Sequence, residues 1–403
     1  MGKPEIRFKG YTDEWEQRKL GDIASSFEYG LNAAAKEYDG ENKYIRITDI
    51  DDNTHKFLTD NLTSPDIDLT GADNYKLTEG DILFARTGAS VGKTYIYRNS
   101  DGLVYYAGFL IRARIKEEYD AEFVFQNTLT DRYNKYIAVT SQRSGQPGVN
   151  AQEYAEFEIN VPKKEEQTKI GTYFCNIDHL ITLHQRKCDE VKTLKKYMLQ
   201  KMFPQNEQKV PEIRFKGFTE AWEQRKLGEL YQRNTERNEN LIGYDKTISV
   251  ATMSYKDDGN GASESSLSTY KVIRVGDIAF EGHTNKQFRF GRFVVNDIGT
   301  GIMSPRFSTL RPLNEMPVNF WKQYIHSESV MRRILVNSTK AGTMMNELVI
   351  PEFLNQTIMV PSENEQAVIG QYFTNIDHLI TLHQQKCEEL KKIKKFMLQK
   401  MFV

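Results

Sequence analysis

The segment "NIDHLITLHQ", residues 176–185, returns without a change at residues 375–384. It is the centre of a longer repeat, "VPKKEEQTKIGTYFCNIDHLITLHQRKCDEVKTLKKYMLQKMF" at 161–203, whose second copy at 360–402 is identical at 30 of 43 positions. A shorter block, "PEIRFKGYTDEWEQRKLGDI" at 4–23, recurs at 211–230 with 15 of 20 positions identical. An ordered duplication of this kind predicts a fold that is built twice from one plan.

Apolar residues of the longer repeat recur in alternating steps of four and three. The first copy has Ile170, Phe174, Ile177, Ile181, Cys188, Val191, Met198 and Met202, with His184 and Lys195 in the two remaining places. The second copy has Ile369, Phe373, Ile376, Ile380, Cys387, Leu390, Met397 and Met401, with His383 and Lys394 in those places. This spacing predicts two coiled-coil helices of about five heptads each, which we expect to pair antiparallel. An ordinary amphipathic bundle helix is the alternative, and so narrow and long a stripe disfavours it.

The residues between the repeats, 24–160 and 231–359, show little resemblance to each other and are rich in strand patterns. Short β-rich runs separated by turn residues predict strands at 43–50, 80–86, 93–98 and 109–115, and again at 246–253, 276–282, 290–295 and 306–312. Short helices are expected around 121–138 and 317–336. The pattern of each insert therefore predicts a compact α+β domain. Trp15 and Trp222, one in each copy of the shorter repeated block, are expected to be core residues.

These patterns together predict an α+β protein with a pseudo-twofold internal repeat. The first domain is expected at 1–160 and the first long helix at 161–203. The second domain is expected at 204–359, with the repeated block from 211, and the second long helix at 360–403. The two helices are predicted to form an antiparallel coiled coil that separates the domains.

Composition excludes several classes of protein. The 403 residues are 39% hydrophobic and 27% charged, and their net charge is −1. No apolar run reaches the ~18 residues of a membrane span, and "MGKPEIRFKG" lacks the apolar core of a signal peptide, so we expect a cytoplasmic protein without membrane contact. The near-neutral charge argues weakly against a nonspecific nucleic-acid binder but is compatible with one local positive face.

Cysteine and histidine spacing disfavours a metal site. Cys175, Cys188 and Cys387 form no CxxC pair. His179 and His184 are five residues apart, as are their copies in the second helix, whereas a helical zinc pair needs a spacing of four. We therefore expect no metal ligands among them.

The stretch "RTGASVGKTYIY" at 86–97 superficially resembles a nucleotide-binding loop. A Walker A loop needs GxxxxGK[ST] and a helix after it, but here the spacing from Gly88 to Gly92 is one residue short. The residues after Lys93 have the pattern of a strand, so the helix N-terminus that would hold phosphates is missing. The sequence predicts a hairpin loop at this place.

Polar loops occupy matching places in the two inserts. One follows a "GDI" strand and the other precedes the long helix. Their side chains are of the types that pair with base edges, because Arg and Lys suit guanine and Gln and Asn suit adenine. The candidate DNA contacts are Arg86, Thr87, Ser90, Lys93, Gln142, Arg143, Ser144 and Gln146 in the first half, and His283, Thr284, Asn285, Lys286, Lys340, Thr343 and Asn346 in the second. From composition alone, solvated hairpin tips remain an equal alternative.

The ordered set of segments resembles the specificity subunits (HsdS) of type I restriction–modification systems. The similar segments are "PEIRFKGYTDEWEQRKLGDI", "EGDILFARTGASVGK", "SGQPGVN" before "INVP", and "EEQTKIGTYFCNIDHLI", together with their twofold recurrence. The resemblance covers the whole chain. It implies two α+β target recognition domains, each binding one half of a bipartite, asymmetric target on double-stranded DNA, with the long helices setting the spacer.

The resemblance also implies a non-catalytic subunit. Two adenine-N6 methyltransferase subunits would dock on the helices, and motor-nuclease restriction subunits could join them. No cofactor is expected in this chain, while S-adenosylmethionine, ATP and Mg would belong to the partner subunits. The sequence contains no (N/D)PP(Y/F) tetrapeptide of an adenine methyltransferase. The alternative from another class is a duplicated coiled-coil scaffold that does not touch DNA, and the unlike polar loops disfavour it.

Overall fold

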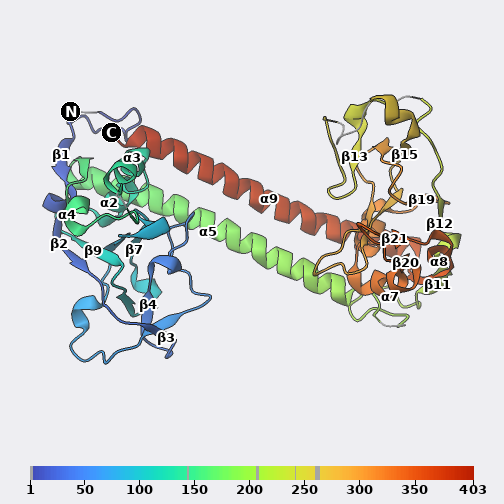
Figure 1. Ribbon diagram of the computed structural model, residues 1–403, viewed down its shortest axis with the longest axis horizontal. Helices are drawn as coiled ribbons and strands as arrows, with labels where there is room; N and C mark the ends of the chain where they lie inside the picture. The colour runs from blue at the N-terminus through green and yellow to red at the C-terminus, as the bar shows by residue number, and fades with distance from the viewer. Residues whose placement is uncertain (1–2, 143–144, 206–207, 241, 259–263) are drawn as a thin grey trace. The chain divides into compact units, whose positions relative to one another are not determined.

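The computed structural model describes residues 3–142, 145–205, 208–240, 242–258 and 264–403. Contacts divide the chain into two compact units (Figure 1). The first unit consists of residues 1–185 and 385–403, and the second of residues 186–384. Each unit therefore contains one α+β domain, part of the first long helix and part of the second. This confirms the predicted fold class.

The two long helices are continuous and nearly equal in length. Helix α5 spans Lys164–Lys201 and helix α9 spans Glu363–Met401. Both begin later than the repeat that predicted them, because Val161 and Val360 each complete a strand before the helix starts. Those strands are β10 (Glu158–Val161) and β22 (Thr357–Val360).

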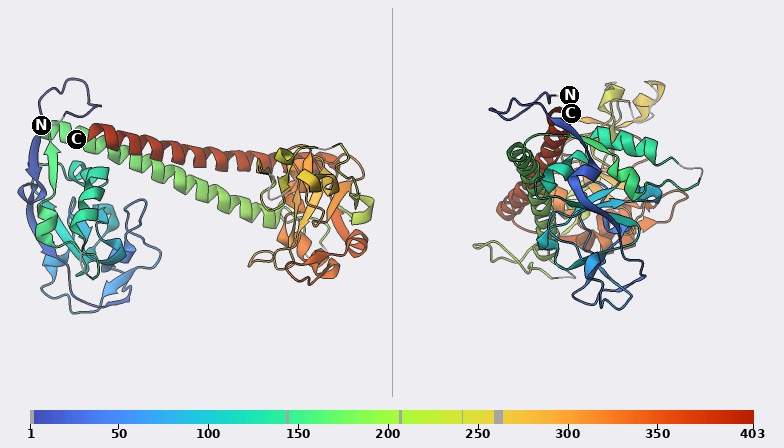
Figure 2. Two further views of the ribbon diagram at one scale, coloured as in Figure 1. Left: turned by 45° about the horizontal axis from the view of Figure 1, so that its top comes forward. Right: turned by 90° about the vertical axis from the view of Figure 1, so that its left-hand side faces the viewer.

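The helices run antiparallel within each unit, as the stripe predicted. In the first unit the Cys387 thiol donates to the Ile181 carbonyl at 3.5 Å, and in the second the Cys188 thiol contacts the Ile380 carbonyl at 3.9 Å. The residues of the predicted stripe form the seam between the two helices. These seam positions are less exposed than most of their neighbours along both helices, in the predicted steps of three and four. Figure 2 shows the two helices side by side in both of its views.

A charged group interrupts the seam at one place in each unit. In the first unit the Lys394 ammonium donates to both carboxylate oxygens of Asp178, at 2.7 and 2.8 Å. The Gln126 side chain, fully buried on helix α2 (Ala121–Asn127), donates to the same carboxylate at 3.2 Å. The second unit repeats the arrangement with Lys195, Asp377 and Gln323 of helix α6 (Val318–Tyr324). One carboxylate thus joins both long helices to the domain in each unit.

The dissimilar inserts contain the same four-stranded antiparallel sheet. In the first unit the strand order is β2–β9–β6–β7, and in the second it is β12–β19–β16–β17. Register matches as well, since Phe84 faces Thr94 in the first sheet and Phe280 faces Phe293 in the second. The first-sheet strands are β2 (Ala24–Tyr29), β6 (Ile82–Ala85), β7 (Thr94–Ile96) and β9 (Leu110–Ile115). The second-sheet strands are β12 (Tyr231–Arg233), β16 (Ile278–Glu281), β17 (Arg292–Val295) and β19 (Thr309–Pro312).

Smaller elements complete the domains. Two-stranded pairs in the first unit are β1 (Glu16–Lys19) with β10, β3 (Ala35–Glu37) with β5 (Thr63–Pro65), and β4 (Lys43–Ile45) with β8 (Val104–Tyr106). Pairs in the second unit are β11 (Glu223–Lys226) with β22, β13 (Ile248–Ser249) with β14 (Ser254–Tyr255), β15 (Lys271–Ile273) with β18 (Gly301–Met303), and β20 (Thr339–Lys340) with β21 (Glu347–Leu348). The short helices are α1 (Leu20–Ile23), α3 (Asp131–Thr140), α4 (Ala151–Ala155), α7 (Glu328–Ser338) and α8 (Ile350–Asn355).

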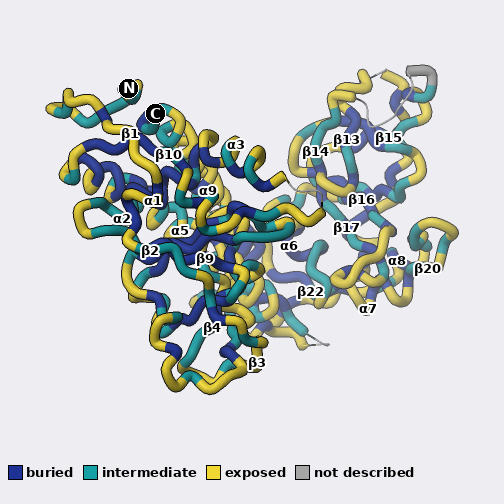
Figure 3. The backbone as a smooth tube through the Cα atoms, turned by 60° about the vertical axis from the view of Figure 1, so that its left-hand side comes forward, coloured by how far each residue is buried: buried dark blue, intermediate teal, exposed yellow. Residues whose placement is uncertain are grey.

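Each core is made from the repeated block, the domain and the end of a long helix. The Trp15 ring packs edge-on against Phe123, which also stacks on Phe402 at the end of the chain. In the second unit Trp222 packs against Phe320, which also contacts Phe203 beyond the end of α5. Both tryptophans are buried, as predicted, and Figure 3 shows buried backbone through the middle of the sheets.

The repeated short block is fixed to the long helices by charge. The Arg7 guanidinium donates to both oxygens of Glu166 at 2.7 and 2.8 Å, and Arg214 does the same to Glu365 at 2.6 and 2.7 Å. Both glutamates are 1% exposed. Bidentate pairs of this kind are strong and directional, so they set how the block enters each unit. No described helix is both long and apolar enough to cross a membrane.

We predict that Asp178→Ala lowers the free energy of unfolding by about 1–3 kcal/mol, because it leaves the Lys394 ammonium, 16% exposed, without its partner. Chemical denaturation followed by circular dichroism measures the loss. Adding Lys394→Met should recover part of the stability, since it removes the unpaired charge.

The matched control is Glu190→Ala, which removes an exposed pair with Arg186 on the same helix and should cost less than about 0.5 kcal/mol. If Asp178→Ala costs no more than this control, the half-buried carboxylate of Asp178 does not hold the helices together.

Candidate DNA interface

The two polar loops predicted separately in the first insert lie side by side. Thr87 pairs with Gly148 in an isolated β-bridge. The Gly88 N–H donates to the Pro147 carbonyl at 3.0 Å, and the Val149 N–H donates to the Arg86 carbonyl at 2.9 Å. The loop after β6 and the loop before α4 therefore form one surface.

The second insert repeats this junction with different residues. The Asn346 N–H donates at 3.0 Å to the carbonyl of Gly282, the residue that follows β16. A Cβ atom at Gly282 would lie 2.0 Å from the Asn346 carbonyl oxygen, so only glycine allows this approach. The loop after β16 thus lies against the β20–β21 hairpin. Both inserts bring their two candidate loops together at the same edge of the same sheet.

Arg86 is held by two rings that the sequence did not single out. Its guanidinium carbon lies 5.2 Å from the centre of the Tyr29 ring and 5.6 Å from that of Phe109. Its Nε donates to the Gly108 carbonyl at 3.0 Å. Phe109 is 56% exposed and Tyr29 is 45% exposed, which is unusual for aromatic side chains. The available sequence signal is an aromatic residue beside a glycine at a strand end, in "EYG" and "AGF".

Lys93 is engaged inside the first unit. Its ammonium forms an ion pair with Asp52 at 2.5 Å and donates to the Ile50 carbonyl at 2.9 Å. The side chain is 12% exposed. Ser90 is half-buried, and its carbonyl accepts the Lys93 N–H at 3.0 Å. In this conformation Lys93 fixes the loop to a neighbouring segment.

The loop that resembles a nucleotide site is a strand connection. Gly92 has a φ of 84°, and a Cβ atom there would lie 2.5 Å from Ile137. Strand β7 begins at Thr94, which confirms the predicted strand after Lys93. A phosphate-binding loop would instead lead into a helix N-terminus.

The remaining candidates of the first half lie in the loop before α4. Gln142 and Gln146 are exposed, and Gln142 has a polar partner within the chain. The amide of Gln146 lies beside Gly88, which places it in the joined surface. Arg143 and Ser144 lie outside the described residues.

The second-half candidates are exposed, except Asn346, which is half-buried. His283, Thr284, Asn285 and Lys286 lie in the loop after β16, where the Asn285 side chain accepts two backbone N–H bonds at 2.8 Å and shapes the turn. Lys340 pairs loosely with Glu347 at 3.4 Å. The hairpin residues Thr343 and Asn346 line one pocket of about 410 Å³, together with Arg306.

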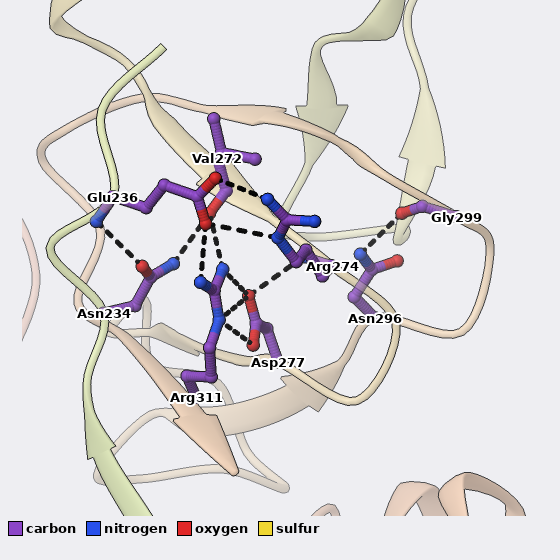
Figure 4. Close-up of polar contacts among 8 residues, drawn as sticks. All are labelled: Asn234, Glu236, Val272, Arg274, Asp277, Asn296, Gly299 and Arg311. Carbon is purple, nitrogen blue, oxygen red and sulfur yellow. Dashed lines mark hydrogen bonds and ion pairs between the residues drawn. The ribbon is translucent and has the colours of Figure 1, made fainter. Parts of the chain in front are cut away.

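Charged residues around the start of β16 are paired with one another (Figure 4). The Arg311 guanidinium donates to Asp277 at 2.8 Å and to Glu236 at 2.5 Å, and Arg274 donates to the same glutamate at 2.7 Å. The two arginines lower the pKa of Glu236 to about 2. In the first unit Arg114 donates to Asp81 in the equivalent position.

The acidic residue of both "GDI" segments is therefore structural. Its carboxylate anchors an arginine of the neighbouring strand and caps a turn N–H, at Thr78 or Arg274. Over the described residues, no group of three or more His, Cys, Asp or Glu side chains is placed to hold a metal ion. The chemistry that the loops offer is hydrogen bonding.

Two half-buried histidines contact the same strand position in the two units. His55 Nδ1 lies 2.9 Å from the Thr94 carbonyl, and His326 Nδ1 lies 3.0 Å from the Phe293 carbonyl. Thr94 and Phe293 are equivalent, because they face Phe84 and Phe280. Burial lowers the pKa of both imidazoles, and the bond to the carbonyl only partly opposes this.

Comparisons with known proteins agree on one family. The family described as the type I restriction modification DNA specificity domain matches residues 12–193 and again residues 219–392. A type I restriction enzyme specificity subunit, MjaVIII of Methanocaldococcus jannaschii, is 22% identical over 407 residues, which cover 95% of this chain and 91% of the relative.

Solved structures show the same fold. The S subunit of a type I restriction–modification system from M. genitalium has a TM-score of 0.64 and 12% identity, covering 100% of this chain and 99% of that one. A chain from a structural study of complex assembly and conformational transition of the type I R-M system has a TM-score of 0.51 and 14% identity, covering 97% of this chain and 98% of that one.

We predict that acid lowers stability through His55 and His326. Their pKa values are depressed in the folded state, so between the ordinary value of ~6.5 and the lower folded value the unfolded chain binds more protons. The free energy of unfolding should therefore be fully retained above about pH 6.5 and should fall as the pH drops through the folded pKa.

The measurement is the free energy of unfolding across this pH range for the native chain and for a His55→Gln, His326→Gln variant. Glutamine keeps a donor for the carbonyl but does not titrate. The variant should lose less stability between neutral and acid pH, and equal losses would rule out the histidines as the cause.

Proposed function

The chain belongs to the family of type I restriction–modification DNA specificity subunits, and we propose that it binds a bipartite, asymmetric target on double-stranded DNA, one half-site in each unit. The observation that carries this proposal is the shared sheet with unlike loops. Both units present two joined loops at the same edge, yet the polar side chains there differ almost completely. A common scaffold with different contact residues suits two different half-sites.

Residues at this edge support contact with base edges. Arg86 keeps N–H groups beyond the one that binds Gly108, and the amide of Gln146 lies beside Gly88 in the same joined loops. Arginine suits guanine and glutamine suits adenine. The whole chain has a net charge of −1, so phosphate contacts would be shared with partner subunits while base contacts remain local.

We propose that the chain itself is non-catalytic. The carboxylates that contact the candidate loops are paired, Asp52 with Lys93 and Glu347 with Lys340. Asp81 and Asp277, at the starts of β6 and β16, are bound by arginines and serve the fold. Methyl transfer and cleavage would belong to two adenine-N6 methyltransferase subunits and to motor-nuclease subunits. S-adenosylmethionine, ATP and Mg would then be bound by those partners.

An exposed apolar row on the helices supports docking of the methyltransferase subunits. In the first unit it consists of Leu180, Leu183, Ile393 and Phe396, each 39–50% exposed. Every member directly precedes a seam position, and in an antiparallel pair these positions flank the same side of the seam. Asp178 follows a seam position, so the recognition domain attaches to the other side. An exposed apolar row of this size is typical of a protein interface.

The second unit has an equivalent row, formed by Leu194, Tyr197, Leu379 and Leu382. Each of its members has a counterpart in the first unit within the repeated sequence. A partner that fits one row would fit the other, and this favours two copies of the same partner.

Methylome sequencing of cells that express the chain with its methyltransferase tests the proposed function. We expect one motif made of two unlike half-sites with a constant spacer. A second variant carries one added heptad in each long helix at the boundary between the units, after Gln185 in α5 and after Gln384 in α9. The seam of this variant stays in register because a whole heptad is added to both helices. Seven residues add about 10 Å of helix, so the spacer should grow by roughly three base pairs of ~3.4 Å each.

If cells do not tolerate the insertion variant, its preferred spacer can be measured from binding of the purified variant complex to duplexes with different spacers. An active variant with the original spacer would show that the helices do not set this distance. The absence of any sequence-specific methylation or binding by the unaltered complex would favour a scaffold that does not touch DNA.

We predict that Leu183→Glu with Phe396→Glu reduces the number of bound methyltransferase subunits from two to one. The charges would disrupt the apolar row of the first unit and leave that of the second intact. Native mass spectrometry of co-expressed complexes measures the stoichiometry. Lys196→Glu, which changes an exposed residue that follows a seam position, should leave two subunits bound. Two bound subunits in the double variant would place the docking surface elsewhere.

A further inference from the structure

Arg306 occupies the second candidate interface, although its sequence context did not suggest it. It lies in the turn before β19 and is exposed. It lines the pocket of about 410 Å³ that Thr343 and Asn346 of the hairpin also line. The pocket thus gathers Arg306 and Ser308 with three polar residues of the hairpin, Thr343, Asn346 and Glu347, from segments far apart in the sequence. The Glu347 carboxylate is paired with Lys340 at 3.4 Å.

The Arg306 guanidinium is available for a ligand. Its central carbon lies 5.5 Å from the centre of the Phe307 ring. Within the part of the chain that the structure describes, no carboxylate lies within ion-pair distance of it, whereas Arg274, Arg292 and Arg311 are all paired. Stacking on a ring restricts the plane of the guanidinium while leaving its N–H edges open.

Sheet register makes Arg306 the counterpart of a first-unit residue at the same edge. Ile82 faces Ala113 in the first sheet, and Ile278 faces Leu310 in the second. Four residues before Ala113 and Leu310 stand Phe109 and Arg306, each in the turn that precedes its strand and so at the same end of its sheet. The carbonyl of Phe109 accepts the Arg86 N–H at 3.0 Å, so Arg86 and Phe109 are neighbours at this edge.

The two units therefore reach one arrangement from different residues. In the first, an arginine follows β6 and a phenylalanine precedes β9. In the second, glycine follows β16 at Gly282, and an arginine with its own phenylalanine precedes β19. In both cases a guanidinium stacked on an aromatic ring lies beside the polar loop that precedes α4 or α8.

We propose that Arg306 determines specificity in the second half-site by donating to O6 and N7 of a guanine, with Phe307 fixing the plane of the guanidinium. This inference rests on the proposed function and adds one base to it. Arginine pairs bidentately with guanine more often than with any other base. Thr343 and Asn346, which line the same pocket, would then contact the neighbouring base pair. A phosphate contact is the competing role for an exposed arginine, and it would be insensitive to sequence.

The experiment uses the complex of this chain with its methyltransferase. Methylome sequencing of the unaltered complex first defines both half-sites. Arg306→Ala and Arg306→Lys are then compared with Arg332→Ala, a control at an exposed position of α7. Binding is measured by competition with duplexes in which each second-half base pair is replaced in turn. Arg86→Ala serves as the mirror variant for the first half-site.

We expect Arg306→Ala to lose discrimination at one G·C pair of the second half-site by roughly 5- to 150-fold, the equivalent of about 1–3 kcal/mol. The first half-site should stay unchanged, and Arg306→Lys should retain part of the preference. Arg86→Ala should give the reverse pattern, and Arg332→Ala should change neither half.

Two outcomes would overturn the inference. One is a second half-site that Arg306→Ala leaves unchanged at every position. The other is a uniform loss of affinity for all duplexes with a shallower salt dependence, which identifies a phosphate contact. If the unaltered complex shows no bipartite motif, the proposed function fails, and the role given to Arg306 fails with it.

Discussion

A carboxylate that binds one lysine across the helix seam joins the two long helices and the domain in each unit. Asp178 holds Lys394 of the opposite helix and Gln126 of the domain, and Asp377 does the same in the second unit. A charge at a seam position lowers stability unless it is paired, so only the register that brings lysine, aspartate and glutamine together is satisfied. The same contact attaches helix α2 or α6 to the coiled coil, and the sheet above that helix is positioned through it.

Stability and specificity are consequently carried by different residues. The bidentate pairs of Arg7 and Arg214, the buried tryptophans and the aromatic helix ends belong to the repeated sequence. The candidate loops contribute exposed side chains and few core contacts. Substitutions in them should therefore cost little folding free energy, because surface positions away from buried features have small effects. A frame of this kind tolerates loops that differ between the two units of one chain.

The sequence was sufficient for the features that repeat at short range. Seam spacing predicted α5 and α9, and turn-bounded β-rich runs predicted the sheet strands, although 43–50 is strand only over Lys43–Ile45 and 246–253 only over Ile248–Ser249. It could not show that two unlike inserts share one strand order, since that depends on pairings distant in sequence. The ion pair of Lys93 with Asp52 and the exposure of Phe109 and Arg306 are also tertiary facts. No local sequence pattern distinguishes a lysine that forms an internal ion pair, such as Lys93, from one that is free to bind a ligand.

Internal pairing also reconciles a nearly neutral chain with the proposed binding to DNA. Arginines within the sheets are neutralised in place, as Arg114 is by Asp81 and Arg311 is by Asp277 and Glu236. The guanidinium groups of Arg86 and Arg306 are instead held by aromatic rings, which orient a cation without cancelling its charge. Two oriented cations add little to long-range attraction, because nonspecific affinity grows with the number of phosphates neutralised. A chain of this composition would therefore contribute discrimination between bases, and most of the attraction to the DNA backbone would have to come from its partners.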